Sequence, residues 1–382
     1  MVRLGDVCTI VSGTTPKSNC PEYWDGNINW VTPAELNDDS DVIYESQRKI
    51  TEQAVQDSSL KPFPAGTVLL SSRAPIGKVA IAGVEMYCNQ GFKNLICSNR
   101  IYNRYLYHFL KNSTEYLNSL GRGATFKEIS KSIVENIEIP LPTLDEQCRI
   151  AAVLDKVSGL IAKRREQLDK LDELVKARFV EMFGDPVSNP KGWNNGTIRD
   201  VVSEVKYGTS RPAVDGGTYK YLRMGNITFD GHLDLSDLKY IDIPDSELEK
   251  CMVRKGDVLF NRTNSKELVG KTCVFDLDEP MVIAGYIIRV RVNKKVLPIY
   301  LSAVLNSQYG KQILADMCKA IVGQANINAQ ELQDIAILIP PIELQEKFSN
   351  SVETVKKSKL TIQQSLDKLE VLKKALIQQY FG

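Results

Sequence analysis

Apolar residues recur at alternating steps of four and three positions in two long stretches of this chain. The first stretch runs from Ile150 to Met182, and the second runs from Phe348 to Tyr380. Steps of this kind place one apolar stripe along an α-helix, as in the seam of a coiled coil. The predicted seam includes Leu154, Val157, Ile161, Leu168, Leu171 and Val175 in the first helix, and Val352, Val355, Ile362, Leu366, Leu369 and Leu376 in the second.

The flanks of the two stretches predict where the helices begin and how they pair. Pro140 and Pro142 precede the first, and Pro340 and Pro341 precede the second, as fits a helix entry. A narrow stripe stabilises an isolated helix poorly, so we expect the two seams to pack on each other. Only a short loop, GDPVSNPKGW from Gly184, follows the first helix, which favours an antiparallel pair. At about 1.5 Å of rise per residue, such helices would separate two globules by roughly 58 Å.

The helices close two halves of the chain that repeat each other. A shift of 198 residues aligns PTLDEQCRI from Pro142 with PPIELQEKF from Pro340. With small gaps, AGTVLLSSRAPIGKVAI from Ala65 resembles KGDVLFNRTNSKELVGKTCVF from Lys255. A period this long indicates a duplicated unit of globule plus helix, not a solenoid. The predicted domains are two globules at residues 1–140 and 185–340 and two helices at 141–184 and 341–382.

Short β runs alternate with turn residues inside both globules. GTVLL, KVAIAG and NLIC in the first half, and GDVLF, KTCVF and MVIAGYIIRVRV in the second, are typical of strands. YNRYLYHFLKNSTEYLNSL and PIYLSAVLNSQYGKQILADM predict amphipathic helices. The predicted fold class is therefore mixed α/β, with two globular domains separated by two long antiparallel coiled-coil helices and related by an internal repeat.

A polar loop between two matched strands is the first candidate for nucleic-acid contact in each half. Arginine can bridge O6 and N7 of guanine, asparagine can bridge N6 and N7 of adenine, and lysine suits phosphates. A solvated hairpin without a ligand is the alternative interpretation, and the matching loops in both halves count against it. The candidates are Ser72, Arg73 and Lys78 in the first half, and Asn261, Arg262, Thr263, Asn264, Lys266 and Lys271 in the second.

Two further polar segments are candidates, with a plain loop as the alternative for each. One lies just before the strand that leads into each helix, where a glycine permits close backbone approach. The other is the segment YKYLRMGNI of the second half. Together they contribute Arg122, Thr125, Lys127, Lys220, Arg223, Asn226, Gln324 and Asn326. Trp24 and Trp30 flank a turn-prone Asp-Gly, and this favours packing over base stacking.

Composition limits the chemistry of the chain. The net charge of +1 argues against a protein that coats nucleic acid indiscriminately, although it allows local basic loops. The eight cysteines and two histidines show no CxxC and no zinc spacing, so no metal is expected. No apolar run approaches the ~20 residues of a membrane span, and MVRLGDV lacks a signal-peptide stretch. A cytoplasmic location is the expectation.

The sequence contains no convincing catalytic motif. VGKT from Val269 has Ser265 where a phosphate-binding loop needs glycine, and SNPKGW lacks the second proline and the aromatic of an adenine methyltransferase motif. No GxSxG or HExxH occurs. Acidic pairs such as Asp172 and Glu173 are expected on the solvent face of the coiled coil. The sequence predicts a non-catalytic chain.

Six further phrases occur along the chain, in the order LGDVCTIVSGTTP, YWDGNINWVTPAEL, GKVAI, GRGATFKEIS, NPKGW and GQANI. Together with the two helical phrases, they resemble the DNA-specificity (S) subunit of type I restriction–modification systems over nearly the whole chain. This resemblance implies two target-recognition domains that each read one half of a bipartite DNA site in host defence, with helices setting the spacing. Leu344 stands where the first copy has Glu146, which would alter one docking surface for a partner.

The resemblance also implies partners and cofactors. Two methyltransferase (M) subunits would dock on the helices, and restriction (R) subunits would join them. S-adenosylmethionine would be bound by M, and ATP and Mg²⁺ would be used by R, with no cofactor on this chain. The loop sequences SSRAPIGK and NRTNSKELVGK differ, so an asymmetric site is expected. The alternatives are a scaffold that does not read DNA and a self-sufficient nuclease or methyltransferase.

Overall fold

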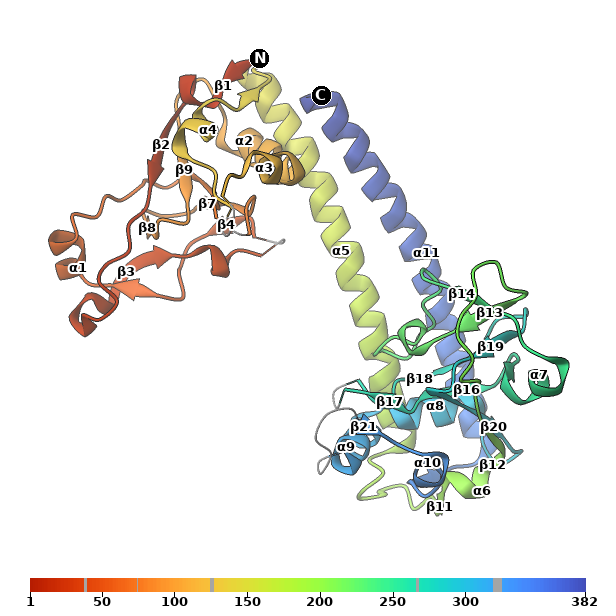
Figure 1. Cartoon of the computed structure of the whole chain (residues 1–382). Coiled ribbons are helices and arrows are strands. Elements are labelled where there is room, and N and C mark those ends of the chain that lie inside the picture. Colours follow the sequence, from red (N-terminus) through yellow and green to blue (C-terminus); the bar gives the residue numbers. More distant parts are fainter. Residues whose placement is uncertain (38–39, 74, 124–126, 266–267, 319–324) are drawn as a thin grey trace. The chain divides into compact units, whose positions relative to one another are not determined.

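The computed structural model describes residues 1–37, 40–73, 75–123, 127–265, 268–318 and 325–382 (Figure 1). The chain forms two compact units. Unit 1 comprises Met1–Arg165 and Gln364–Gly382, and unit 2 comprises Glu166–Gln363. Each unit contains a globule of short strands and helices and a segment of each of the two long helices, α5 (Leu144–Phe183) and α11 (Ile342–Phe381). This confirms the mixed α/β class with two long helices.

The globule of unit 1 is built on a five-stranded sheet. In sheet order its strands are β2 (Cys8–Ser12), β9 (Lys93–Cys97), β6 (Val68–Leu70), β7 (Val79–Ala82) and β4 (Val42–Ile43). A three-stranded sheet contains β5 (Lys49–Ile50), β3 (Trp24–Val31) and β8 (Tyr87–Cys88), and β1 (Val2–Arg3) pairs with β10 (Glu138–Ile139). The helices are η1 (Leu4–Asp6), η2 (Pro21–Tyr23), η3 (Pro33–Glu35), α1 (Glu52–Asp57), α2 (Asn103–Asn112), α3 (Thr114–Leu120) and α4 (Lys131–Glu135).

The globule of unit 2 has two four-stranded sheets. The first is β12 (Val202–Tyr207), β20 (Ile287–Val292), β16 (Val258–Asn261) and β18 (Thr272–Val274), and the second is β14 (Lys239–Ile241), β13 (Tyr219–Leu222), β19 (Met281–Ile283) and β15 (Met252–Val253). Two pairs complete it, β11 (Asn194–Thr197) with β22 (Ala336–Ile339) and β17 (Thr263–Asn264) with β21 (Ala325–Asn326). The helices are α6 (Ile198–Val201), η4 (Met224–Asn226), α7 (Asp245–Cys251), α8 (Pro298–Asn306), α9 (Gln308–Met317) and α10 (Ala329–Gln333).

Three predicted segments are each divided in the structure. MVIAGYIIRVRV forms β19 and β20, which belong to different sheets. The two amphipathic stretches each form two helices that meet at a serine. Ser113 donates a hydrogen bond to the carbonyl of Phe109, and Ser307 caps α9 by accepting from the N–H of Gly310 at 3.1 Å. A side chain competing for backbone hydrogen bonds in this way favours a cap over a continuous helix.

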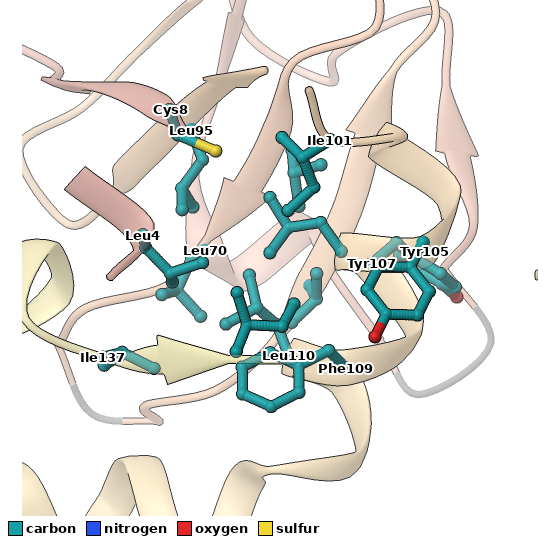
Figure 2. Close-up of a cluster of buried hydrophobic side chains, with 14 of the residues drawn as sticks. Leu4, Cys8, Leu70, Leu95, Ile101, Tyr105, Tyr107, Phe109, Leu110 and Ile137 are labelled. Atoms are coloured by element: carbon teal, nitrogen blue, oxygen red, sulfur yellow. The ribbon is translucent and has the colours of Figure 1, made fainter. Parts of the chain in front are cut away.

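Apolar side chains of α2 form the centre of unit 1. Tyr105, Leu106 and Leu110 are fully buried against the sheet residues Leu70 and Leu95 (Figure 2). The helices close the same cluster, because Ile150, Leu154 and the end of α11 pack against it. The ring of Phe381 lies 5.1 Å from that of Tyr105 and 5.5 Å from that of Phe109. The start of α5 and the end of α11 are therefore part of one core.

Unit 2 has the matching arrangement, but its core contains the end of α5 and the start of α11. Phe179 and Phe183 from the end of α5 pack with Phe348 from the start of α11 and with Tyr300 of α8, at ring-centroid distances of 4.9 to 6.0 Å. Phe183 here occupies the place that Phe381 has in unit 1. The helix segments therefore run antiparallel within each unit.

All twelve residues of the predicted seam are buried or half-buried. Lys359 occupies one seam position, and its ammonium group pairs with the carboxylate of Asp172 at 2.7 Å. The expectation that Asp172 faces solvent was therefore wrong, because a lysine at this point of the seam needs an anionic partner. In unit 1, Arg165 pairs with Glu370 across the same helices at 2.9 Å.

Candidate nucleic-acid interface

In each half, the first polar loop predicted from the sequence connects two paired strands. The two hairpins occupy corresponding places in the repeat. In unit 1, between β6 and β7, Ser71 N–H donates to the carbonyl of Lys78 at 2.9 Å. In unit 2, between β16 and β18, Asn261 N–H donates to the carbonyl of Lys271 at 2.8 Å. A glycine with positive φ precedes each lysine (Gly77 in unit 1), and each donates back to the first residue of the loop. The two loops therefore match residue by residue at their ends.

The lysine at the end of each loop holds a 3-10 turn. Lys78 Nζ donates to the carbonyls of Pro33 and Leu36 at the turn η3, and Lys271 Nζ donates to the carbonyl of Met224 in η4 at 2.9 Å. Burial lowers the pKa of Lys271. Because these ammonium groups bond to the protein's own carbonyls, their role here is to fix the loop against its neighbour.

The second candidate loop lies beside the first in both units. Ile129 N–H donates to the carbonyl of Ser72 at 2.9 Å, and Ile327 N–H donates to the carbonyl of Arg262 at 2.8 Å. Further along, β17 pairs with β21 in unit 2, and Arg73 forms a bridge with Glu128 in unit 1. The structure thus brings together, within each unit, two loops that lie far apart in the sequence.

Unit 1 surrounds one carboxylate with basic side chains. Glu128 accepts from Arg73 Nε at 3.0 Å and from Lys93 Nζ at 3.2 Å. Burial alone would raise the pKa of Glu128, but hydrogen bonds from these two cations hold it below its ordinary value. Arg122, which bridges to Glu128 through its backbone, and Lys127 have exposed side chains. The local charge of these five groups is positive, as suits a phosphate backbone.

Unit 2 presents a different set of groups on the same frame. The guanidinium of Arg262 lies 4.9 Å from the ring centroid of Tyr207, and one N–H donates weakly to the carbonyl of Gly285 at 3.5 Å. Its buried Nε has no hydrogen-bond partner among the described residues. Thr263 donates to the Asn326 carboxamide oxygen at 3.0 Å, which orients Asn326 at the surface. Stacking and hydrogen bonding limit the freedom of both side chains.

The segment YKYLRMGNI supplies paired and buried groups. Lys220 pairs with Glu279 at 2.6 Å, and Arg223 pairs with Asp237 at 2.7 Å. Asn226 is buried and accepts from the N–H of Arg223 at 2.8 Å, closing the turn η4.

The predicted contact residues fall into three groups by exposure. Arg73, Arg122, Lys127 and Asn326 are exposed, and Lys78, Lys220, Arg223, Arg262 and Asn264 are half-buried. Buried are Ser72, Asn226, Asn261, Thr263 and Lys271. Thr125, Lys266 and Gln324 lie outside the described residues. All seventeen remain predicted contacts; the buried ones bond mainly within the protein.

Sequence reasoning missed Lys93, Glu128 and a pair of glutamines. Gln147 accepts from the N–H of Tyr102 at 2.8 Å and donates to the carbonyls of Arg100 and Pro142 at 3.1 and 2.9 Å. Gln345 makes the same three bonds in unit 2, to Leu297 at 2.8 Å, Lys295 at 3.1 Å and Pro340 at 2.9 Å. The signal was present, since both glutamines stand at the same place in the aligned phrases PTLDEQCRI and PPIELQEKF.

Trp30 is packed inside the globule of unit 1. It is 2% exposed, its indole N–H donates to the carbonyl of Thr14 at 3.1 Å, and its ring meets that of Trp24 edge-on at 5.1 Å. Arg48 lies over Trp24 at 3.9 Å. These contacts favour the packing interpretation of both tryptophans.

Two features are absent from the part of the chain that the structure describes. It contains no group of three or more histidine, cysteine, aspartate or glutamate side chains placed to hold a metal ion. None of its helices combines the length and the apolar character needed to cross a bilayer.

The repeated unit with its paired loops corresponds to a known domain. Residues 1–172 and 190–373 match the type I restriction modification DNA specificity domain. Because these matches cover most of the chain, it belongs to this family, with two copies of the domain. This confirms the resemblance of the sequence to the specificity subunits of type I restriction–modification systems.

Individual relatives extend over most of the chain. The type I restriction enzyme MjaIX specificity subunit of Methanocaldococcus jannaschii is 29% identical over 98% of this chain and 90% of its own length. The EcoKI specificity subunit of Escherichia coli K12 is 25% identical over 74% of this chain and 65% of its own length. The crystal structure of an S subunit from M. genitalium covers 100% of this chain and 95% of its own, with a TM-score of 0.57 at 15% identity. A chain from a study of type I R-M assembly covers 99% and 96%, with a TM-score of 0.62 at 20% identity, so both structures show the fold.

Proposed function

We propose that this chain is the non-catalytic DNA-reading subunit of a type I restriction–modification complex. Each globule reads one half of a bipartite, asymmetric site in double-stranded DNA. The observation that carries the proposal is the repetition of one loop frame in both units with different side chains at its surface. A frame fixed by matched backbone hydrogen bonds is suited to presenting interchangeable contacts.

The side chains of the two frames suit different sequences. Arg73, Arg122 and Lys127 give unit 1 a cationic loop pair, whereas unit 2 presents Arg262 and Asn326. Arginine suits guanine and asparagine suits adenine in the major groove, while exposed lysine suits phosphates. Because the two sets differ, the two halves of the target differ in sequence.

The long helices serve as spacer and docking surface. Two M subunits dock on the helical regions, and R subunits join the complex. Leu174 of α5 and Leu372 of α11 support this assignment, because they occupy equivalent places in the repeat and are 53% and 46% exposed. Apolar side chains exposed at matching positions are typical of a surface that a partner covers twice.

The chemistry of methylation and cleavage belongs to the partners in this proposal. S-adenosylmethionine binds to M, and ATP with Mg²⁺ is used by R. The near-neutral net charge of this chain fits a subunit that relies on its partners for much of the phosphate contact. The complex works in the cytoplasm, where the host DNA is.

Long-read methylation mapping of a host with and without the gene tests the proposal. We expect one adenine-methylated motif, made of two different half-sites and a fixed gap, which is absent from the deletion strain. Exchanging residues 185–340 for the corresponding globule of a relative should change one half-site and leave the other. A methylome that is identical with and without the gene would contradict the proposal.

Substitution of one arginine in each loop separates DNA reading from mere scaffolding. Arg73→Ala and Arg262→Ala should weaken methylation at the whole site while the complex with M still assembles. Lys78 and Lys271 are poor choices, because their loss would disturb the loop frame. Unchanged methylation in the double variant would favour a scaffold that does not read DNA.

A further inference from the structure

Two cysteines stand directly opposite each other in the sheet of unit 1. Cys8 of β2 is the antiparallel partner of Cys97 of β9. Ser98 N–H donates to the carbonyl of Val7 at 2.9 Å, so the hydrogen bond flanks the cysteine pair. In a non-hydrogen-bonded pair of this kind the Cα atoms are about 4.5 Å apart and the side chains are closest. A disulfide needs about 4.4 to 6.8 Å between Cα atoms, so the backbone is already placed for one.

The two thiols project from the same face of the sheet. Opposite residues of an antiparallel pair share a face, and here that face is the core side. Cys8 packs in the main cluster of unit 1 (Figure 2), and Cys97 packs against that cluster. A hydrogen bond between the thiols, with burial second, raises the pKa of Cys8. Cys8 and Cys97 are not joined by a disulfide in this structure.

The two cysteines differ in their access to solvent. Cys8 is 7% exposed, whereas Cys97 is half-buried and lines a surface pocket of about 310 Å³. Gly66, Ile96 and Tyr102 are among the other residues that line it. A small oxidant can therefore approach Cys97 from this pocket, and Cys8 lies directly opposite Cys97 in the sheet. This is the arrangement of an attacked thiol and a resolving thiol.

We propose that Cys8 and Cys97 form a redox-responsive dithiol that a hydroperoxide converts into a cross-strand disulfide. The Cys97 thiolate attacks the outer peroxide oxygen, the O–O bond breaks, and the leaving alkoxide takes up the proton of Cys97 to become an alcohol. Cys8, after losing its proton, attacks the sulfur of the Cys97 sulfenic acid. The S–S bond forms and hydroxide leaves, taking up that proton as water. Two thiols lose two electrons, and one hydroperoxide gains them.

The geometry also predicts that this disulfide is reversible. Cys97 is half-buried and lines a surface pocket, and exposed disulfides are reduced more readily than buried ones. The modification therefore suits a cell interior in which thiols are normally reduced. It concerns the globule itself and does not depend on the proposed DNA-reading function.

Oxidation of the full chain followed by mass spectrometry tests this proposal. The protein is treated with hydrogen peroxide, remaining thiols are alkylated, and peptides are mapped without reduction. We expect a linked pair of peptides containing Cys8 and Cys97, with an intact mass two daltons lower. Dithiothreitol should restore both alkylation sites. The oxidised protein should also unfold at a temperature higher by several degrees, because the link constrains the unfolded chain.

Two substitutions provide the controls. Cys97→Ser, at a half-buried position, should abolish the link and leave Cys8 as a free thiol, while Cys148→Ser, which removes an exposed thiol on α5, should leave the link intact. Recovery of both Cys8 and Cys97 in alkylated form after oxidation would overturn the proposal. So would oxidation of Cys97 to sulfinic acid alone, or its pairing with a different cysteine.

Discussion

Replacing Gln345 with leucine removes three hydrogen bonds from the joint between α11 and the globule of unit 2. The carboxamide is 0% exposed, accepts from the N–H of Leu297 and donates to the carbonyls of Lys295 and Pro340. Leucine fills much of the same space but offers no polar atom. One backbone N–H and two carbonyls consequently lose their partner inside the protein.

The expected cost follows from the number of bonds. A neutral hydrogen bond contributes on the order of 1 kcal/mol, and a buried group left unpaired costs about 1 to 3 kcal/mol. Three bonds therefore stabilise the joint by about 3 kcal/mol. Since about 1.4 kcal/mol corresponds to a factor of ten, local opening should become ~100-fold more frequent.

Hydrogen exchange with mass spectrometry measures this opening directly. The peptide that contains Leu297 should lose protection in Gln345→Leu, while the peptide that contains Tyr102 should be unchanged. Gln147→Leu should give the reverse result, because it makes the same three bonds in unit 1. Gln379→Leu, on an exposed face of α11, is the matched control and should change neither peptide.

Equal protection of Leu297 in wild type and Gln345→Leu would refute the reasoning. It would mean that water or a neighbouring group replaces the carboxamide without cost. A loss of protection over both units would also contradict it, since the bonds are local.

Three further predictions concern function, pH and assembly. Arg262→Lys should change the methylated motif only in the half-site read by unit 2, because lysine cannot make the bidentate contact of arginine; methylation mapping measures this. Burial lowers the pKa of His108 below its ordinary 6.5, against the opposing effect of Asp155 at 2.6 Å, so the folded state disfavours protonation. The contribution of neutral His108 to the free energy of unfolding is therefore present above pH ~6.5 and is lost as the pH falls. Denaturant unfolding between pH 5 and 8 should show that His108→Asn loses less stability at low pH than the wild type. Leu174→Glu and Leu372→Glu should each prevent binding of one M subunit, as sedimentation would detect, with the circular dichroism spectrum unchanged.

Periodicity and repetition made the architecture predictable from the sequence. The heptad steps predicted α5 and α11, and the alignment of two halves predicted two globules of one kind. These signals are local or repeat in register, so a single sequence contains them. The split of the two amphipathic stretches was also within reach, since each contains Asn-Ser at the break, at Ser113 and Ser307.

The candidate interface was predictable only in outline. Its loops were found, but Asn261, Thr263 and Lys271 are buried among partners from distant segments, such as the carbonyl of Met224. Composition cannot distinguish a polar side chain that faces a ligand from one that holds a turn. Glu128 was missed for the same reason, because its partner Lys93 lies on β9, far away in the sequence.

The pairing of distant segments in unit 1 has a consequence for biosynthesis. Its core contains Phe381, yet Tyr105 and Phe109, which hold that ring, are translated more than two hundred residues earlier. All of unit 2 leaves the ribosome before residues 364–382 do. The globule that is made first is therefore completed last, and the apolar side chains that the end of α11 packs against stay uncovered until those last residues are made. Chaperone dependence of the nascent chain should reflect that order.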